Sequence, residues 1–439
     1  MKFIRLVKTF FGFFYFGITF NGVRLPWHNS ITILETVVLN FAPRVSMWRE
    51  RKARSGPWVQ GEWTIDLKDT HEIRWRLSLN SKNYPNLKGG RSMKYRYLGA
   101  SGLLMSRITL GTMTFGAPKW GCDEKESHAI TRNYIEAGGN CLDIADIYAG
   151  GRSEEIVGNL MPDLNRDGII IASKFSLPSG PAITQFGANR KQIVSSCEKS
   201  LKRLKTDYID IYYVHVPDPV TPFEETLRAM DDLVRQGKVR YTGASMFFGW
   251  QLAKAQGVSE THNLEKMVAG QYIYSLIHRE LEREIIPAAV DAGIGITCFS
   301  PLGGGLLTGK YGKQRKPEKG TRAFFRTEVD GPRFWHPIGY KTSEIVEDVS
   351  TKSGIPMAKL AITWPLGRKF VTSVIIGVKT VDQLEENMKS ADWDLPKEVW
   401  DELEKRTRPE EEYMTWYNKF NYERFSNAGE FHEVKTELI

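Results

Sequence analysis

From Met93 onward, short apolar runs alternate with amphipathic helical stretches, and this alternation limits the chain to one class of fold. The apolar runs are continuous, which indicates burial on both faces, and strands that are linked through helices run parallel. About eight strand–helix units favour a (β/α)₈ TIM barrel over an open doubly wound sheet. The predicted strands are residues 108–112, 140–145, 169–173, 209–215, 240–244, 267–271, 294–299 and 373–377.

The predicted helices lie between these strands and include KESHAITRNYIEAG, RSEEIVGNLM, RKQIVSSCEKSLKRL, EETLRAMDDLVRQG and REIIPAAVDAG. Three of them end at Gly138, Gly237 and Gly293, and glycine favours the left-handed C-terminal cap. An open sheet would carry GxGxxG after its first strand, but GTMTFG stands there, so the Rossmann fingerprint is missing. A P-loop is also disfavoured, because Tyr311 in GGLLTGKY replaces the Ser or Thr that binds Mg²⁺.

Charge divides the chain at the point where the alternation begins. The 439 residues carry 60 Lys and Arg against 52 Asp and Glu, of which residues 1–92 hold 15 and 6. The remainder is nearly neutral, so no nucleic acid or membrane partner is expected for it. We interpret 1–92 as a basic N-terminal extension rather than an independent domain, and 93–439 as the barrel with a C-terminal extension.

The extension opens with Lys2, Arg5 and Lys8 before an apolar run at 9–20, the outline of a signal peptide. No cleavage site follows, and the run is too short to span a bilayer. A weak interfacial anchor is one interpretation. We favour upstream sequence joined to the coding region by an early start assignment, which makes Met93 the natural start.

The spacing of the four cysteines indicates a reducing cellular compartment. Cys122, Cys141, Cys197 and Cys298 are widely spaced with no CxxC pair, so neither a disulfide framework nor a zinc site is predicted. With 41% hydrophobic and 26% charged residues, the composition is that of a globular protein. We expect a cytoplasmic protein without a bound metal.

Four polar residues at or just after the ends of predicted strands suggest catalysis. Asp143 lies in NCLDIA, Tyr148 in the loop that follows, Lys174 ends IIIASK and His215 ends IDIYYVH. In a barrel, the carboxyl ends of the strands share one face, where catalytic groups lie. Each residue alone is more often structural, but together they predict a site.

The chemistry predicted for these residues is general acid catalysis. We expect the Lys174 ammonium to favour the Tyr148 phenolate and bring its proton within range of transfer at neutral pH. Tyr148 would protonate a carbonyl oxygen as hydride arrives at the carbon. His215 would orient that oxygen, while Asp143 would hold Lys174.

The later strands offer groups for a hydride donor. Ser245 and Gln271 would bond a carboxamide, and Phe299 would stack on a nicotinamide ring. The glycines at 303–305 would let the backbone approach a pyrophosphate, with Lys310 as a cation. Lys379 and the start of a helix near Thr380 would meet a ribose 2′-phosphate.

The combined motifs resemble the aldo-keto reductases. They run from MKYRYLGASGLLMSRITLGTMTFG through LDIADIYAGGRSEEIVG, DYIDIYYVHVPDP and FSPLGGGLLTGKY to VIIGVKTVDQLEENM, covering residues 93 to about 408. The resemblance implies a barrel that binds NADP(H) and reduces small aldehydes or ketones with a tetrad at Asp143, Tyr148, Lys174 and His215. It implies cofactor contacts at Gly111, Thr112, Met113, Ser245, Gln271, Phe299, Ser300, Pro301, Leu302, Gly303, Lys310, Gly377, Lys379, Gln383, Glu386 and Asn387.

The chain departs from the family pattern at three positions. Met246 stands where many members have an Asn that bonds the carboxamide, so orientation would depend on Ser245 and Gln271. Ile144 replaces the usual Thr, and Phe299 replaces the common Tyr or Trp.

The same resemblance includes the potassium-channel beta subunits, which offer the alternative of a non-catalytic nicotinamide-binding regulatory subunit. That group typically has Asn at the histidine position, so His215 favours a reductase. Substrate specificity is expected from loops at the barrel mouth, residues 315–340 and 408–427, which are rich in aromatic and Arg residues.

Overall fold

The computed structural model describes residues 93–426 and, before them, five strands between residues 16 and 79; side chains are described for 93–421. The chain divides into two compact units, Met1–Gly90 and Arg91–Ile439. The first holds an antiparallel sheet in the order β2-β1-β3-β4-β5. The prediction that residues 1–92 form no independent domain stays a prediction. The strands are β1 Phe16–Phe20, β2 Val23–Leu25, β3 Arg44–Arg49, β4 Gly61–Asp66 and β5 Arg74–Leu79.

The second unit is a closed barrel of parallel strands, which confirms the predicted TIM barrel. Neighbours follow chain order from β8 to β15, and β15 pairs with β8 to close the ring. Each predicted strand is present to within two or three residues. The strands are β8 Ile108–Gly111, β9 Cys141–Asp143, β10 Ile170–Phe175, β11 Ile209–Val214, β12 Val239–Ser245, β13 Met267–Ile273, β14 Gly295–Phe299 and β15 Val371–Gly377.

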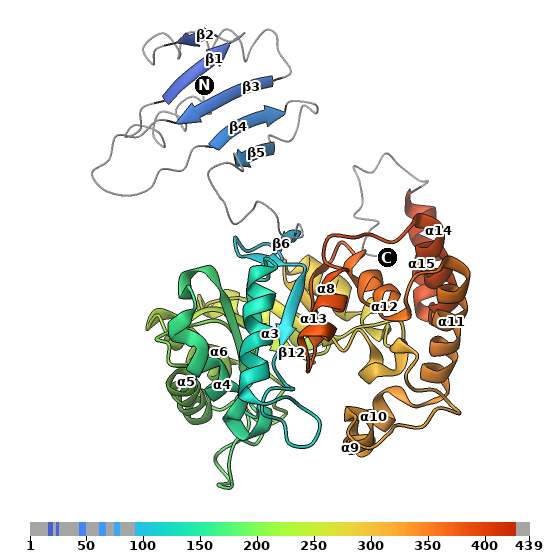
Figure 1. Cartoon of the computed structure of the whole chain (residues 1–439). Coiled ribbons are helices and arrows are strands. Elements are labelled where there is room, and N and C mark those ends of the chain that lie inside the picture. The colour runs from blue at the N-terminus through green and yellow to red at the C-terminus, as the bar shows by residue number, and fades with distance from the viewer. Residues whose placement is uncertain are drawn as a thin grey trace. The chain divides into compact units, whose positions relative to one another are not determined.

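Helices surround the barrel on the outside (Figure 1). The predicted caps are confirmed, since Gly138, Gly237 and Gly293 all have positive φ just beyond their helices. The helices are α3 Glu124–Glu136, α4 Arg152–Leu160, α5 Arg190–Leu204, α6 Phe223–Arg235, α7 Gly249–His262, α8 Ile285–Asp291, α11 Pro337–Ser353, α12 Met357–Leu366, α13 Val381–Met388 and α14 Lys397–Thr407.

A hairpin closes the amino-terminal end of the barrel. It comprises β6 Tyr95–Tyr97 and β7 Leu104–Ser106, which pair antiparallel. Leu98 and Met105 pack in one cluster with side chains of the barrel interior, among them Tyr213 and Ala269. At Gly99, whose φ is 56°, a Cβ would lie 2.2 Å from the Gly293 carbonyl oxygen, so only glycine fits. Access to the interior is therefore left to the opposite end.

The two stretches expected as mouth loops are largely helical, which corrects that expectation. Residues 315–340 contain α9 Arg322–Phe325, α10 Thr327–Phe334 and the start of α11. The Thr321 hydroxyl caps α9 by accepting a hydrogen bond from the Phe324 amide. Residues 408–427 contain α15 Tyr413–Ser426.

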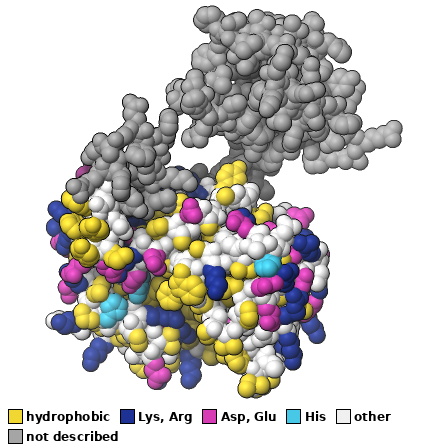
Figure 2. All heavy atoms as spheres, turned by 180° about the vertical axis from the view of Figure 1, so that it is seen from behind, with side chains coloured by type: hydrophobic (Ala, Val, Ile, Leu, Met, Phe, Trp, Pro, Cys, Tyr) yellow, Lys and Arg dark blue, Asp and Glu magenta, His cyan; other side chains and the backbone are white. Residues whose placement is uncertain are grey.

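The surface of the barrel unit mixes Lys and Arg with Asp and Glu on the face shown in Figure 2, as its near-neutral composition predicts. Across the part of the chain that the structure describes, no helix combines the length and apolar character needed to cross a membrane.

Candidate active site

The four predicted tetrad residues come together at the carboxyl end of the barrel. The Nζ of Lys174 lies 2.7 Å from Oδ1 of Asp143 and 3.1 Å from Oη of Tyr148. The rings of Tyr148 and His215 meet edge to face, with centroids 6.1 Å apart. Lys174 and Asp143 are buried, whereas Tyr148 and His215 are half-buried.

Local sequence explains how Tyr148 reaches this position. β9 ends at Asp143, and Lys174 also donates to the Ile144 carbonyl at 2.6 Å, which anchors the chain just after the strand. A 3₁₀ turn then begins at Tyr148, followed by Ala149 and Gly150 at φ values of 50° and 67°. These left-handed residues reverse the chain and direct it into α4.

Two hydroxyls fix the backbone beneath the tetrad. The Thr112 hydroxyl donates to the Asp143 carbonyl at 3.1 Å, and the Ser153 hydroxyl bonds Thr112 at its carbonyl and hydroxyl oxygens. Thr112 was predicted as a cofactor contact. Its side chain is buried and supports the strand that carries Asp143.

Gln271 reaches across the barrel to the tetrad. Its Nε2 donates to Oδ2 of Asp143 at 2.7 Å, while Lys174 bonds Oδ1. The sequence prediction assigned Gln271 to a carboxamide only, and this contact adds a partner for it. A polar residue at the end of a strand was the only signal available, because the cross-barrel pairing depends on closure of the ring.

Burial governs the pKa of Tyr148, which corrects the predicted balance. Burial raises the pKa of Tyr148 above its ordinary value, although the Lys174 ammonium acts to lower it. For Lys174, burial opposes the ammonium, but the charges of Asp143 and Tyr148 outweigh it and raise the pKa of Lys174. At neutral pH the phenol is therefore protonated and the lysine charged.

His215 is electrically neutral in this setting. Burial, followed by the charges of Lys174 and Arg333, lowers the pKa of His215 to about 3. Its Nδ1 is buried with no hydrogen-bond partner among the described residues. A neutral imidazole donates one N–H and accepts at the other nitrogen, so the ring has unused capacity to bond a substrate oxygen.

The predicted cofactor residues follow the ends of the strands that complete the ring. Gly377 is paired in register with Gly111, and Gly111 with Asp143, which places three adjoining strand ends in a row. Ser245 is in register with Gln271. Phe299 ends β14, and Met113, Ser300, Pro301 and Leu302 lie in the loops that follow β8 and β14.

The glycine-rich segment forms a tight turn after β14. Gly303, Gly304 and Gly305 have φ values of 56°, 64° and 99°, and a Cβ at Gly303 would meet Ile277 at 2.6 Å. Such a turn suits close approach of a phosphate to the backbone. Lys310, which follows this turn, is exposed. Tyr311 is buried, so its hydroxyl is unavailable to a metal-bound nucleotide.

The start of α13 is partly occupied by protein groups. Thr380 caps the helix by accepting from the Gln383 amide, and Glu126 on α3 accepts from the Val381 amide at 3.0 Å. The Gln383 side chain accepts from the Lys379 amide. A phosphate here would depend on the Lys379 side chain more than on helix amides, and would share the helix end with the Glu126 carboxylate. Further along α13, Glu386 pairs with Lys389 and Asn387 is buried.

Met246 follows Ser245 in a left-handed conformation, with φ at 59°. Asn adopts this conformation more readily than Met does. The departure at this position therefore loses a polar group and also places an unsuited side chain on a strained backbone.

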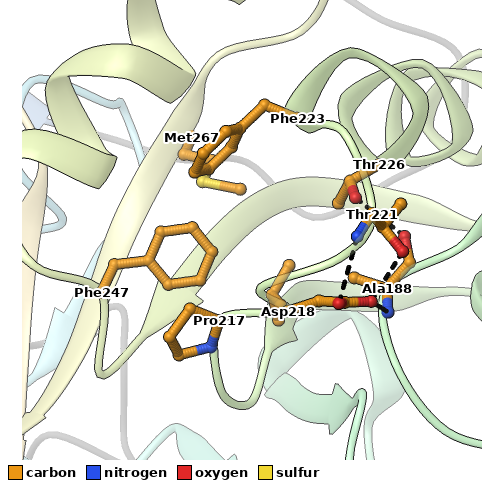
Figure 3. Close-up of a pocket in the computed structure, with 9 residues that line it drawn as sticks. Ala188, Pro217, Asp218, Thr221, Phe223, Thr226, Phe247 and Met267 are labelled. Atoms are coloured by element: carbon orange, nitrogen blue, oxygen red, sulfur yellow. Dashed lines mark hydrogen bonds between the residues drawn. The ribbon is translucent and has the colours of Figure 1, made fainter.

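A small cavity lies apart from the tetrad, lined by Ala188, Val214, Pro217, Asp218, Thr221, Phe223, Thr226, Phe247 and Met267 (Figure 3). Asp218 joins two loops of the mouth there. Its Oδ2 accepts from the Ala188 amide and the Thr221 hydroxyl, each at 2.7 Å. None of the predicted site residues lines this cavity, so we treat it as structural.

The barrel matches one known family of proteins. The model of the Aldo/keto reductase family matches residues 107–407. The chain belongs to the aldo/keto reductase family, whose members are oxidoreductases that act on small carbonyl compounds and typically bind a nicotinamide cofactor.

Several relatives share about a third of the sequence. An uncharacterized oxidoreductase, YrpG of Bacillus subtilis, is 36% identical over 70% of this chain and 94% of its own length. A probable voltage-gated potassium channel subunit beta of Arabidopsis thaliana is 36% identical over 68% and 92%. A versiconal hemiacetal acetate reductase of Aspergillus parasiticus is 32% identical over 70% and 95%.

Proposed function

We propose that this protein reduces aldehydes or ketones to alcohols with NADPH, and that Tyr148 is the general acid. The observation that carries the proposal is the hydrogen bond of 3.1 Å between Lys174 Nζ and Tyr148 Oη, with Asp143 behind the lysine. NADPH would supply the hydride to the carbonyl carbon. Cytoplasmic location and the division at residue 93 belong to the same proposal.

Each residue of the tetrad would have a separate role in protonating or positioning the carbonyl oxygen. Tyr148 donates its proton from Oη to the carbonyl oxygen, and the phenolate left behind is stabilised by the Lys174 ammonium. Neutral His215 donates an N–H to the same oxygen and so fixes its position between two donors. Asp143 holds Lys174 charged and in place.

Two features of the mouth support a nicotinamide cofactor. The turn at Gly303 to Gly305 leaves the backbone free of side chains where a pyrophosphate would approach. Ser245, in register with Gln271, and Phe299 lie on consecutive strands and would hold the carboxamide and the ring face. Lys379 and Lys310 would bind the phosphates.

The test is Tyr148→Phe in the full-length protein. NADPH oxidation with a panel of small and aromatic aldehydes is expected to fall by about a thousandfold or more, because general acid catalysis of this step is lost. NADPH binding, followed by fluorescence, should be unchanged. Full activity of the variant would show that another group is the acid.

The channel-subunit alternative makes a different prediction. A regulatory subunit would bind the nicotinamide tightly, turn over no aldehyde and purify with a membrane partner. The tetrad with His215 favours the reductase, since a neutral donor beside Tyr148 serves catalysis rather than cofactor retention.

A further inference from the structure

Three arginines lie together on one segment of the barrel mouth. Arg322 is on α9, Arg326 follows it and Arg333 is on α10, at the end of the barrel opposite the β6–β7 hairpin (Figure 1). Arg322 has a full partner, because Asp330 is buried and bonds its Nε and Nη2 at 2.8 and 3.0 Å. That pair is neutral and holds the segment in shape.

Arg326 lacks a comparable partner. Its Nε lies 3.8 Å from the Asp330 oxygen that already bonds Arg322, and this nitrogen is buried without a hydrogen bond among the described residues. The guanidinium lies over the Trp120 ring, 5.4 Å from the centroid. Burial lowers the pKa of Arg326, and the charges of Arg322 and Arg333 act in the same direction while the Asp330 carboxylate opposes them.

Arg333 is the third arginine of the cluster, and its charge acts on a residue of the tetrad. Its side chain is exposed and forms no ion pair within residues 93–421. The charge of Arg333 contributes to lowering the pKa of His215. The charge of Arg322 likewise acts to lower the pKa of Tyr148. Because α9 and α10 lie at the same end of the barrel as the tetrad (Figure 1), the charges of the cluster act on the groups that would hold the carbonyl oxygen.

Counting charges around the tetrad leaves a surplus. Lys174 cancels Asp143, Arg322 cancels Asp330, and Tyr148 and His215 are neutral. Arg326, Arg333 and the exposed Glu328 remain, a net charge of +1, and the buried Nε of Arg326 is costly to leave without a partner unless an anion joins it. Guanidinium groups bind carboxylates through paired N–H bonds with defined geometry.

We propose that Arg326 and Arg333 bind an anionic group on the substrate, so that the preferred substrates are aldehydes or ketones carrying a carboxylate. The inference rests on the proposed function, since it places the carbonyl between Tyr148 and His215. Cofactor phosphates are expected elsewhere, at Gly303 to Gly305, Lys310 and Lys379. The anion would lie on the side of the mouth formed by α9, α10 and Trp120, over whose ring the Arg322 and Arg326 guanidinium groups lie.

The experiment compares two aldehydes of nearly equal shape, 4-carboxybenzaldehyde and its methyl ester, in the full-length protein with NADPH. We expect kcat/KM to favour the carboxylate by about tenfold, and Arg333→Met to bring the ratio between the two aldehydes close to one. Arg326→Met should act in the same direction. The matched control is Arg315→Met, which removes an exposed arginine that pairs with Glu347 on α11. It should leave the ratio of kcat/KM between the two aldehydes unaltered.

A second readout separates this inference from the proposed function. Calorimetric binding of the two compounds to protein saturated with NADP⁺ needs no turnover, and the carboxylate should bind more tightly by a similar factor. Absence of turnover with retained carboxylate preference would refute the reductase but keep the anion site. Equal binding and equal kcat/KM for both compounds would overturn the inference.

One further outcome assigns the arginines differently. If Arg326→Met and Arg333→Met raise the KM for NADPH and leave the ratio between the two aldehydes unchanged, the cluster binds the cofactor and the inference is wrong. Because Arg333 is exposed, its variant remains informative even if the Arg326 variant does not fold.

Discussion

The side-chain amide of Gln271 donates a hydrogen bond of 2.7 Å to Asp143, and the two residues stand on strands diametrically opposite in the ring. With Lys174 on the other carboxylate oxygen, Asp143 is held from two directions at the centre of the barrel. The carboxylate is thus positioned by closure of the barrel as well as by its own strand.

Gln271→Leu should therefore damage catalysis and stability together. Loss of the donor leaves Oδ2 of Asp143 buried without this partner, which should lower the free energy of unfolding by about 1–3 kcal/mol. We expect kcat to fall by roughly tenfold as Lys174 is held less firmly. Urea unfolding and steady-state kinetics measure the two effects.

The matched control is Gln256→Leu. Gln256 on α7 also donates from Nε2, to the Met267 carbonyl at 2.9 Å, but it lies outside the tetrad. It should lose similar stability with kcat intact. A Gln271→Leu variant with normal kcat would show that Lys174 alone suffices to fix Asp143.

His215 should make the fold sensitive to acid. Its pKa of about 3 lies below the ordinary value of about 6.5, so the unfolded chain binds a proton between these pH values and the native protein does not. Stability contributed by neutral His215 is complete above pH 6.5 and is lost as the pH falls, by about 2 kcal/mol at pH 5. His215→Asn should lose less stability between pH 7 and pH 5 in urea titrations. Parallel losses in both proteins would place His215 in contact with water.

Two substitutions at the start of α13 should move cofactor selectivity in opposite directions. Lys379→Ala should raise the KM for NADPH by about tenfold and leave NADH unaffected, because the 2′-phosphate loses its cation. Glu126→Gln should lower the KM for NADPH by about two- to fivefold, because a carboxylate is removed from the helix end. Equal changes with both cofactors would place the 2′-phosphate elsewhere.

Met246→Asn should stabilise the protein and improve nicotinamide binding. Asn tolerates the φ of 59° better than Met, for a gain of about 1 kcal/mol, and restores an amide beside Ser245. The control is Lys205→Asn, at a helix end with φ of 52° and remote from the site, which should gain stability without changing the KM. Thermal unfolding and NADPH kinetics distinguish the two effects.

The barrel could be predicted from sequence because its strands are apolar throughout and its helices end at glycine. The proximity of Asp143, Lys174 and His215 could also be predicted, since they lie at or just after the ends of strands that must share a face in any parallel barrel. α7 was not among the predicted helices, and its Gly249 and Gly257 weaken the helical pattern. α9 and α10 were expected as a mouth loop, and Gly320, Gly331 and Pro332 weaken the helical pattern of this segment.

The contacts that set protonation were beyond sequence reasoning. The predicted effect of Lys174 on the pKa of Tyr148 has the right sign, but burial is larger, and burial depends on packing of the whole ring. In the same way, Asp330 could not be assigned to Arg322 rather than to Arg326. As a result, Arg322 hydrogen-bonds the Asp330 carboxylate directly, whereas the nearest approach of Arg326 to it is 3.8 Å.

Because the β6–β7 hairpin covers the amino-terminal end of the barrel, the substrate and the product of the proposed reaction would enter and leave by the opposite end. Under the proposed function, the alcohol formed beside Tyr148 would leave by the mouth through which the next aldehyde enters. Crowding of the entrance by incoming aldehyde will then delay departure, so the rate should decline at high aldehyde concentration rather than level off.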